Sequence, residues 1–385
     1  MTERAGGEAV VVGLGMCAAL GSDVRTNCAS ARAGISRASA LEHYRARSAV
    51  DGTPEPVIAH QANLFTRGFE GDPRLVRLAQ AALTDLLGQA VTIDWQQRPH
   101  TFYLALPDSD RIHTGAELIA DDEARQAWRE GEAARLQDDA SPRVSNAARG
   151  RRIVEQAARL ARWPGAVSVQ FASFSGHAAG LEAIHAALSD LSSGVTELAV
   201  VLGVDSLLDA STLQWLHLRG RLKCDGAPAG VQPGEAGVAI ALSRTAATGS
   251  STARLRAVSL AEERRTLLDG KSAAGEALAT VIAAVWDERQ PASAWIISDQ
   301  NGEVYRAMDW GHAVVRLRAQ FDAFAEPILW YPAASFGDVG AASSLAGVCL
   351  AVRAWERQYA PAAAALVVAA SDGEERAALA LTRIA

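Results

Sequence analysis

Two hydroxyl groups and an imidazole, from Ser173, Ser175 and His177, lie in one short segment of this chain. Serine and histidine are the usual nucleophile and general base of covalent acyl transfer, and an aspartate such as Asp338 could orient the imidazole. The small residues after His177 predict a helix over residues 180–191, which places the imidazole near a helix N-terminus. That position disfavours the imidazolium that a general base must become.

Two other interpretations of His177 stay open. In the first, the imidazole has a structural role: it fills a pocket at the helix start and hydrogen-bonds to Asp338, Asn301 or the backbone. In the second, it binds a metal or has some other role. We favour the structural role over the catalytic one with Ser175 or Ser173, and we expect no metal and no cofactor.

The four cysteines, Cys17, Cys28, Cys224 and Cys349, are too widely spaced for a disulfide framework or a Cys-x-x-Cys metal site. A reducing, cytoplasmic location is the simplest expectation from this pattern. Cys349 lies in an apolar helical segment and is expected in the core. Cys224 is expected in an exposed loop, where it is a weak candidate for a relocated nucleophile.

Short Val/Ile/Leu runs alternate with Ala-rich amphipathic stretches, which predicts a layered α/β fold. The best strand candidates are residues 10–13, 167–171, 198–202, 238–242, 295–298 and 365–369. The best helix candidates are residues 74–87, 180–191, 274–286 and 341–359. A polar stretch at about 113–152 predicts a solvated insertion or a partner-facing lobe.

Composition excludes several classes of protein. The net charge of −7 and the scattered arginines argue against a nucleic-acid footprint. No apolar run is long enough for a membrane span, and the acidic N-terminus does not fit a signal peptide. Gly13-Leu-Gly15 lacks the third glycine and the downstream acid of a dinucleotide-binding motif, so this turn is expected to be structural. A hydrophobic fraction of 49% is ample for a large core.

Residues 10–16 with 33–35, in the N-terminal half, form a recognisable motif. It is similar to the opening strand, turn and helix of the β-ketoacyl synthases of the thiolase superfamily. Residues 174–184, followed by 198–205, are similar to the elbow that carries their nucleophilic cysteine, its buried helix and the next strand. The segments align without a gap, so the family's cysteine position falls on His177.

The later part of the chain resembles the same family while departing from its active site. Residues 335–347 are similar to the region where the family has Gly-His and a small-residue helix, and the histidine position reads Asp338. The family's lysine, five residues earlier, falls on Ala333. Its other histidine loop matches Asn301-Gly302 with Asp309 eight residues after Asn301, although Asp299 is a shifted alternative match.

Two further segments complete the resemblance, which covers most of the chain. Residues 232–237 are similar to the family's Pro-Gly-Glu-Gly turn, and the family's glycine-rich C-terminal loop has become residues 370–375, Ala-Ser-Asp-Gly-Glu-Glu. The resemblance implies a thiolase-like α/β fold, a duplicated five-layer α/β/α/β/α sandwich. Its halves would be residues 1–245, with the polar insertion, and 252–385, joined near 245–251.

Each position that would carry condensation departs from the family pattern, because a soft nucleophile and two imidazoles have become His177, Asn301 and Asp338. The resemblance therefore implies a catalytically inactive scaffold, partner subunit or adaptor, such as an accessory protein beside type VI secretion effectors. It also implies a homodimer or heterodimer with a related subunit, with acyl carrier protein and acyl-CoA as candidate ligands. The alternative is an acyl-thioester acyltransferase or hydrolase that uses His177 with a nearby serine.

Overall fold

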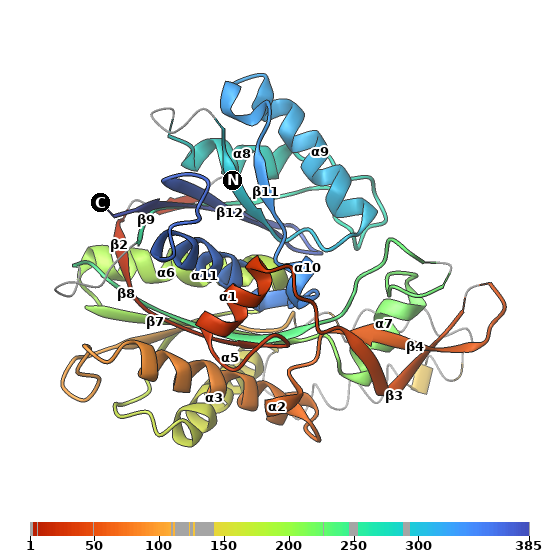
Figure 1. Cartoon of the computed structure of the whole chain (residues 1–385), viewed down its shortest axis with the longest axis horizontal. Helices are drawn as coiled ribbons and strands as arrows, with labels where there is room; N and C mark the ends of the chain where they lie inside the picture. The colour runs from red at the N-terminus through yellow and green to blue at the C-terminus, as the bar shows by residue number, and fades with distance from the viewer. Residues whose placement is uncertain are drawn as a thin grey trace.

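The structure of the chain is a computed structural model, shown in Figure 1. The residues that it describes are 3–5, 7–48, 50–108, 111, 123, 126–127, 142–225, 227–245, 253–287 and 293–384. Most of the polar stretch 113–152 and of the junction near 245–251 lies outside these residues. The last part of that stretch, from Pro142, forms the start of helix α5.

The N-terminal half contains a five-stranded mixed sheet. Its strands in sheet order are β6-β5-β7-β8-β2, in which β5 pairs parallel with β6 and β7, and β8 pairs antiparallel with β7 and β2. These strands are β2 (Ala9–Ala18), β5 (Thr101–Ala105), β6 (Val169–Ser173), β7 (Leu198–Ser206) and β8 (Glu235–Ser243).

The C-terminal half repeats this topology strand for strand. The order is β11-β10-β12-β13-β9, with the same parallel and antiparallel partners in the same places. These strands are β9 (Ala253–Glu262), β10 (Trp295–Ser298), β11 (Ile328–Trp330), β12 (Ala364–Ala370) and β13 (Glu375–Arg383). The two sheets meet where β2 pairs antiparallel with β9, at Ala9 opposite Leu255 and Val10 opposite Arg254. The short strand β1 (Glu3–Ala5) also pairs with β9.

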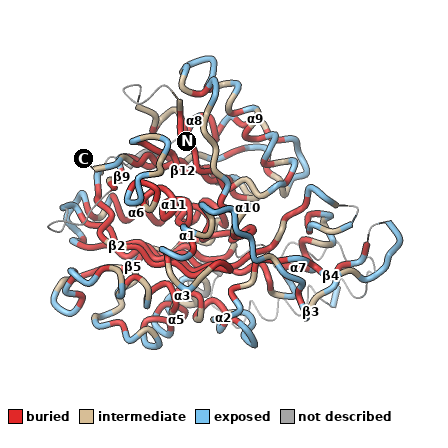
Figure 2. The backbone as a smooth tube through the Cα atoms, in the orientation of Figure 1, coloured by how far each residue is buried: buried red, intermediate tan, exposed pale blue. Residues whose placement is uncertain are grey.

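Helices complete the five layers (Figure 1). Helices α6 (Ala179–Ser193) and α11 (Ser343–Glu356) lie between the two sheets and are largely buried, as Figure 2 shows. Helices α3 (Gly71–Gln89) and α5 (Pro142–Leu160) cover the outer face of the first sheet. Helices α8 (Glu276–Val285) and α9 (Val304–Arg318) cover the outer face of the second. The predicted duplicated α/β/α/β/α sandwich is thus confirmed.

Smaller elements surround this sandwich. Helix α1 packs against β2 and α11, and the hairpin β3–β4 packs with α7 in a separate small hydrophobic cluster. The remaining elements are α1 (Val24–Arg32), β3 (Ser39–Arg47), β4 (Pro54–Ala59), α2 (Asn63–Thr66), η2 (Gly176–Ala178), α7 (Ala210–Leu218), η3 (Asp322–Phe324), α10 (Ala333–Phe336) and η4 (Gly340–Ala342). No helix among the described residues is long and apolar enough to cross a membrane.

The predicted elements exist, with shifted ends. The strand at 295–298 matches β10, and the strand at 167–171 is displaced by two residues in β6. The helix predicted to Tyr359 ends at Glu356 in α11. Several elements were not predicted, because the short strands β5 and β11 and the Ala-rich β13 lack a strong period-2 pattern. The proposed bounds of the two halves stay a prediction.

Gly15 lets α3 approach β2 closely, and this contact predicts a pair of opposite effects. A Cβ at Gly15 would lie 2.2 Å from the Ala82 carbonyl oxygen and 2.5 Å from the Leu86 backbone nitrogen. We expect Gly15→Ala to lower the free energy of unfolding by about 1–3 kcal/mol through overpacking.

Gly88, also on α3, is the matched control. It is exposed, and a Cβ there would meet nothing within 4 Å, so Gly88→Ala should raise the free energy of unfolding by about 0.5–1 kcal/mol. Urea denaturation of both variants tests this, and equal effects would contradict it.

Candidate functional site

The candidate site lies at the N-terminal ends of the two central helices. In the first half, β6 leads through η2 into α6, and His177 lies in η2, where Gly176 adopts a φ of +65° that favours glycine. In the second half, η4 leads into α11, and Asp338 lies just before η4 between Gly337 and Gly340, which also have positive φ. The topological repeat therefore brings His177 and Asp338 together from corresponding turns.

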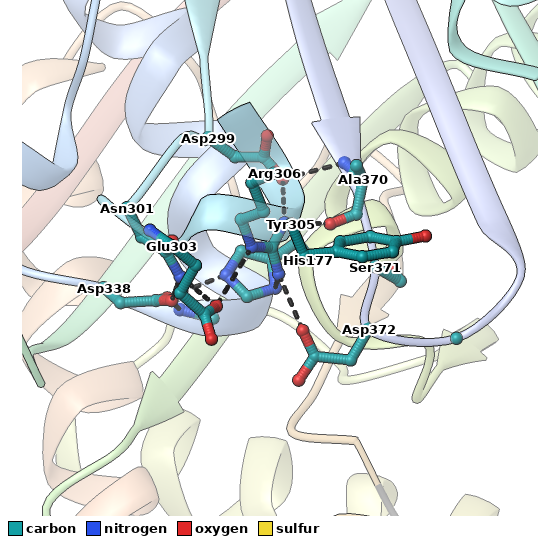
Figure 3. Close-up of polar contacts among 12 residues, drawn as sticks. His177, Asp299, Asn301, Glu303, Tyr305, Arg306, Asp338, Ala370, Ser371 and Asp372 are labelled. Carbon is teal, nitrogen blue, oxygen red and sulfur yellow. Dashed lines mark hydrogen bonds and ion pairs between the residues drawn. The ribbon is translucent and has the colours of Figure 1, made fainter. Parts of the chain in front are cut away.

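Both ring nitrogens of His177 are occupied, as Figure 3 shows. Nε2 lies 2.8 Å from Asp338 Oδ1, and Nδ1 lies 3.0 Å from the Nη2 of Arg306. A guanidinium has only donors, so Nδ1 must accept and Nε2 must carry the proton that it donates to Asp338. The imidazole is thereby held as one neutral tautomer in this arrangement.

Burial and Arg306 each lower the pKa of His177, but the Asp338 carboxylate outweighs them and the pKa is raised above its ordinary value. The hydrogen bond from Arg306 opposes protonation at Nδ1, because an Nδ1–H would face an N–H of the guanidinium. The contact with Arg306 therefore favours the neutral ring, whereas the raised pKa favours its protonation as the pH falls.

Asp338 is the acceptor at the centre of three hydrogen bonds. Besides His177, Asn301 donates from Nδ2 to Oδ2 over 2.6 Å, and the Gly340 backbone N–H donates to Oδ1 over 2.9 Å. Burial alone would raise the pKa of Asp338, but the interactions with His177, Arg306 and Asn301 hold it well below its ordinary value. The residues at the three family positions therefore form one chain of contacts, His177–Asp338–Asn301.

Arg306, on α9, binds the other side of His177 to a set of buried carboxylates. Its guanidinium lies 3.1 Å from Asp299 Oδ2 and 2.8 Å from Asp372 Oδ1, and it also donates to the Ala370 carbonyl oxygen. Its side chain is only 3% exposed. Arg306 therefore connects β10, α9 and the loop after β12 beside the Nδ1 of His177.

A second arginine, Arg221, closes the network. It forms two hydrogen bonds to Glu303, at 2.7 and 3.0 Å, and two to Asp372, at 2.8 and 3.1 Å. Asn301 also donates to Glu303 over 2.9 Å. Burial would raise the pKa of Asp372, whereas Arg221 and Arg306 lower it well below its ordinary value. Bidentate pairing of this kind is typical of buried arginine–carboxylate contacts.

Little space is left beside this network. The cavity bounded by His177, Asp338, Arg221 and Asp372 has a volume of about 20 Å³. Such a volume admits about one water molecule, whereas pockets for organic ligands usually measure about 300–1,000 Å³. Arg111 also lines the cavity and is held by Asp205, with 2.9 Å between Nη2 and Oδ1. The arrangement bounded by the described residues therefore has no room for an acyl chain.

The serines near His177 have a different partner. Ser173 Oγ and Ser175 Oγ lie 2.5 and 2.7 Å from the same oxygen, Oε2 of Glu182 on α6, and 2.8 Å from each other. Among the described residues neither hydroxyl bonds to His177, whose nitrogens are taken by Asp338 and Arg306. The geometry of a Ser–His pair is therefore not present in this arrangement.

The other residues singled out from the sequence differ in whether they reach this network. Ala333, at the family's lysine position, begins the short helix α10 and is half-buried. Asp309 forms a buried ion pair with Arg376, with 2.9 Å between Oδ2 and Nε. Asp299 accepts from Arg306 and from the Ala370 N–H. The loop that replaces the family's glycine-rich segment supplies Asp372 to the network.

The cysteines do not provide a replacement nucleophile. Cys17, Cys28 and Cys349 are buried, and burial raises the pKa of Cys17 and of Cys28 to about 12. Cys224 is half-buried, and burial, with Glu55 and Asp225 nearby, raises its pKa as well. A reactive thiolate needs the opposite shift. Within the described residues, no group of three or more His, Cys, Asp or Glu side chains could hold a metal ion.

Sequence reasoning missed Arg306, Arg221, Glu303 and Asp372 as parts of the site. Two of them could have been found from the sequence. Glu303 and Asp372 are charged residues in loops where the ketosynthase family has small or uncharged residues. No local pattern points to Arg221, because it comes from the other half of the chain, after α7.

Comparisons with known proteins agree with the architecture. The ketosynthase/chain length factor of ishigamide is 17% identical with a TM-score of 0.72, and the match covers 99% of this chain and 100% of that one. A type II polyketide ketosynthase solved with its acyl carrier protein is 15% identical with a TM-score of 0.70, over 99% and 100% of the chains.

An oxazolomycin ketosynthase domain from Streptomyces albus JA3453 is 16% identical, with a TM-score of 0.69 over 98% of this chain and 75% of that one. No protein-family model and no curated protein sequence matches the chain. At these identities the likeness concerns the fold, and it extends over nearly the whole chain. The chain therefore has the thiolase-like fold of the ketosynthases and chain length factors.

Proposed function

We propose that this chain is a ketosynthase-fold protein that does not condense acyl chains and serves instead as a partner subunit or scaffold. The observation that carries the proposal is the state of His177, whose two ring nitrogens are bound by Asp338 and Arg306. An imidazole fixed in this way has no free lone pair for a base or for an acyl acceptor.

The surroundings of His177 support the same proposal. A condensing enzyme must polarise a thioester carbonyl with hydrogen-bond donors in a space that admits the substrate. Here Asp338 is ionised and can only accept hydrogen bonds. The side-chain amide of Asn301 already donates to Asp338 and Glu303. The cavity beside these residues has a volume of about 20 Å³. The helix ends that would carry the chemistry instead carry interactions that stabilise the sandwich.

An unpaired sheet edge supports the partner role. Strand β6 pairs only with β5 among the described residues, and Phe171 on it is half-buried. Such an edge can add a strand from another chain. We propose that the partner is a second copy or a related subunit, which makes the protein a homodimer or heterodimer.

The structural neighbours suggest candidate ligands and partners for this chain. One structural neighbour is a ketosynthase in complex with an acyl carrier protein, and another is a ketosynthase/chain length factor. For this chain we propose a protein partner, with acyl carrier protein or acyl-CoA as the candidate ligands. An adaptor role beside type VI secretion effectors is a further version of the proposal, suggested by the sequence of residues 298–306.

Intact-mass spectrometry after exposure to a panel of acyl-CoA and acyl-carrier-protein donors tests the proposal. We expect no acyl adduct and full recovery of the thioesters, because no nucleophile is free. The experiment uses a Cys224→Ala background, since Cys224 is the one cysteine of the four that is not buried and could be acylated adventitiously. A condensing ketosynthase exposed to the same donors serves as the positive control.

The variants His177→Ala and Ser175→Ala decide between the proposal and its enzymatic alternative. An adduct that forms on the parent protein and disappears in either variant would overturn the silent-subunit proposal and identify a relocated nucleophile or base. Thioester hydrolysis by the parent protein without a detectable adduct would also overturn the proposal if the hydrolysis is lost in His177→Ala.

A further inference from the structure

A hollow of about 370 Å³ lies at the far end of helix α11 from the candidate site. It is bounded by α1, which packs on α11 (Figure 1), and by the C-terminal end of α11 with the residues after it. Asp338 precedes the first turn of α11, whereas Arg353 and Arg357 lie at its last turn, about 20 Å along the helix axis. The hollow is therefore separate from the His177 network.

Four arginines line this hollow: Arg25, Arg32, Arg353 and Arg357. Arg353 is paired with Glu356. Within the described residues, Arg25, Arg32 and Arg357 have no carboxylate within ion-pair distance. The whole chain has 44 acidic and 37 basic residues, so three uncompensated positive charges around one hollow depart strongly from its average surface.

Two of the four arginines, Arg32 and Arg353, have packing contacts, whereas Arg25 and Arg357 are exposed. The Arg32 guanidinium lies 4.1 Å from the centre of the Tyr359 ring, and Tyr359 stacks on Trp330, which in turn contacts Trp295 in the core. Arg353 is largely buried, and its Nε has no hydrogen-bond partner. These contacts reduce the side-chain entropy that would be lost on binding an anion.

A second hollow of about 380 Å³ shares Arg25 and Arg353 with the first. It is also lined by Glu356 and by β2 around Gly13. A ligand with a charged end and a neutral end could therefore place its charge among the arginines and its remainder toward β2. Together the two hollows offer more room than a single bound ion needs.

We propose that this hollow binds a phosphate-bearing small molecule with two or more negative charges, such as a nucleoside diphosphate. Guanidinium groups pair with phosphate oxygens through parallel hydrogen bonds, and several of them on one anion compensate its desolvation. The volume of about 370 Å³ lies in the range of small-molecule pockets. The proposal is independent of the role of His177, and it adds a ligand to a surface that the proposed function does not use.

Isothermal titration calorimetry at constant ionic strength tests the proposal with inorganic phosphate, pyrophosphate and ADP as separate probes. We expect pyrophosphate or ADP to bind with a dissociation constant below about 1 mM. In the double variant Arg25→Gln/Arg357→Gln, the binding should weaken about tenfold or more, because two charge-assisted contacts are lost. ADP binding more tightly than pyrophosphate would identify a nucleotide, whereas equal binding would identify the phosphate groups alone as the ligand.

The matched control is Arg151→Gln/Arg152→Gln, two exposed arginines on α5, which covers the outer face of the first sheet. It changes the net charge by the same amount and should leave the binding unchanged. Equal weakening in both double variants would overturn the proposal, because binding would then reflect overall charge. Absence of binding by all three probes would overturn it as well, and so would binding of poly-glutamate alone, which would mark a docking surface for an acidic polypeptide.

Discussion

Arg306→Met should lower the free energy of unfolding by roughly 3–5 kcal/mol, the usual cost of removing one partner from a buried ion pair. Arg306 holds Asp299, Asp372 and the Nδ1 of His177 together, with a side chain only 3% exposed. Methionine would fill much of the volume but would leave Asp299 without its paired arginine and Asp372 with Arg221 alone. The measurement is denaturant unfolding at pH 7 and at a fixed salt concentration.

Arg316→Met, on the same helix α9, is the matched control. Arg316 is about two-fifths exposed and interacts with Glu276 over 3.4 Å, so its loss should change the unfolding free energy by no more than about 0.5 kcal/mol. The loss of unfolding free energy in Arg306→Lys should lie between those of the two methionine variants, because lysine keeps the charge but not the planar guanidinium group. A loss below about 1 kcal/mol in Arg306→Met would show that the network contributes little to stability.

Much of the architecture could be predicted from the sequence, because the motifs that position the backbone are kept. Gly13 and Gly15 lie in β2, Pro233 and Gly234 precede β8, and Gly337 precedes the turn to α11. A Cβ at Gly234 would lie 2.2 Å from the Phe336 carbonyl oxygen, so the two loops approach each other through that glycine. Such contacts depend on residue type and are visible in a sequence.

The topological repeat could not be seen in the sequence, because strand order is a property of pairing and not of residue identity. β5 and β10 occupy the same place in the two halves, yet Thr101–Ala105 and Trp295–Ser298 share only an apolar character. Short buried strands of this kind read as apolar runs, without a pattern that distinguishes one from another. The repeat appears once the parallel and antiparallel partners are known.

The three family positions were found from the sequence, but their neighbours were not. His177, Asn301 and Asp338 stand in recognisable motifs, whereas Arg306 meets His177 across 129 residues and Arg221 meets Asp372 across 151. Ion pairs at such separations depend on how the two halves pack. The network explains why the site holds little empty space although the family's catalytic groups are absent. Arginine and carboxylate side chains fill the space and form ion pairs with one another.

Acid should destabilise the protein through the same network. The pKa values of Asp338 and Asp372 are both lowered in the folded state, whereas an unfolded aspartate titrates near pH 4. A lowered folded-state pKa contributes stability that is present above pH 4 and is lost as the pH falls below it. We expect the unfolding free energy to decline below about pH 4, with each of the two carboxylates adding about 1.4 kcal/mol per pH unit to the slope.

Asp338→Asn tests the assignment of this slope. The variant should be less stable than the parent at pH 7, because an amide N–H would face the donors of His177, Asn301 or Gly340. Below pH 4 its decline should be shallower by about 1.4 kcal/mol per pH unit, since one titrating group is gone. Asp322→Asn, at an exposed position, should keep the parent's profile. His177 does not disturb this window, because its raised pKa contributes stability that is lost only as the pH rises above about 6.5. An unchanged slope in Asp338→Asn would mean that Asp338 does not contribute to this acid dependence, and other carboxylates would then account for the decline.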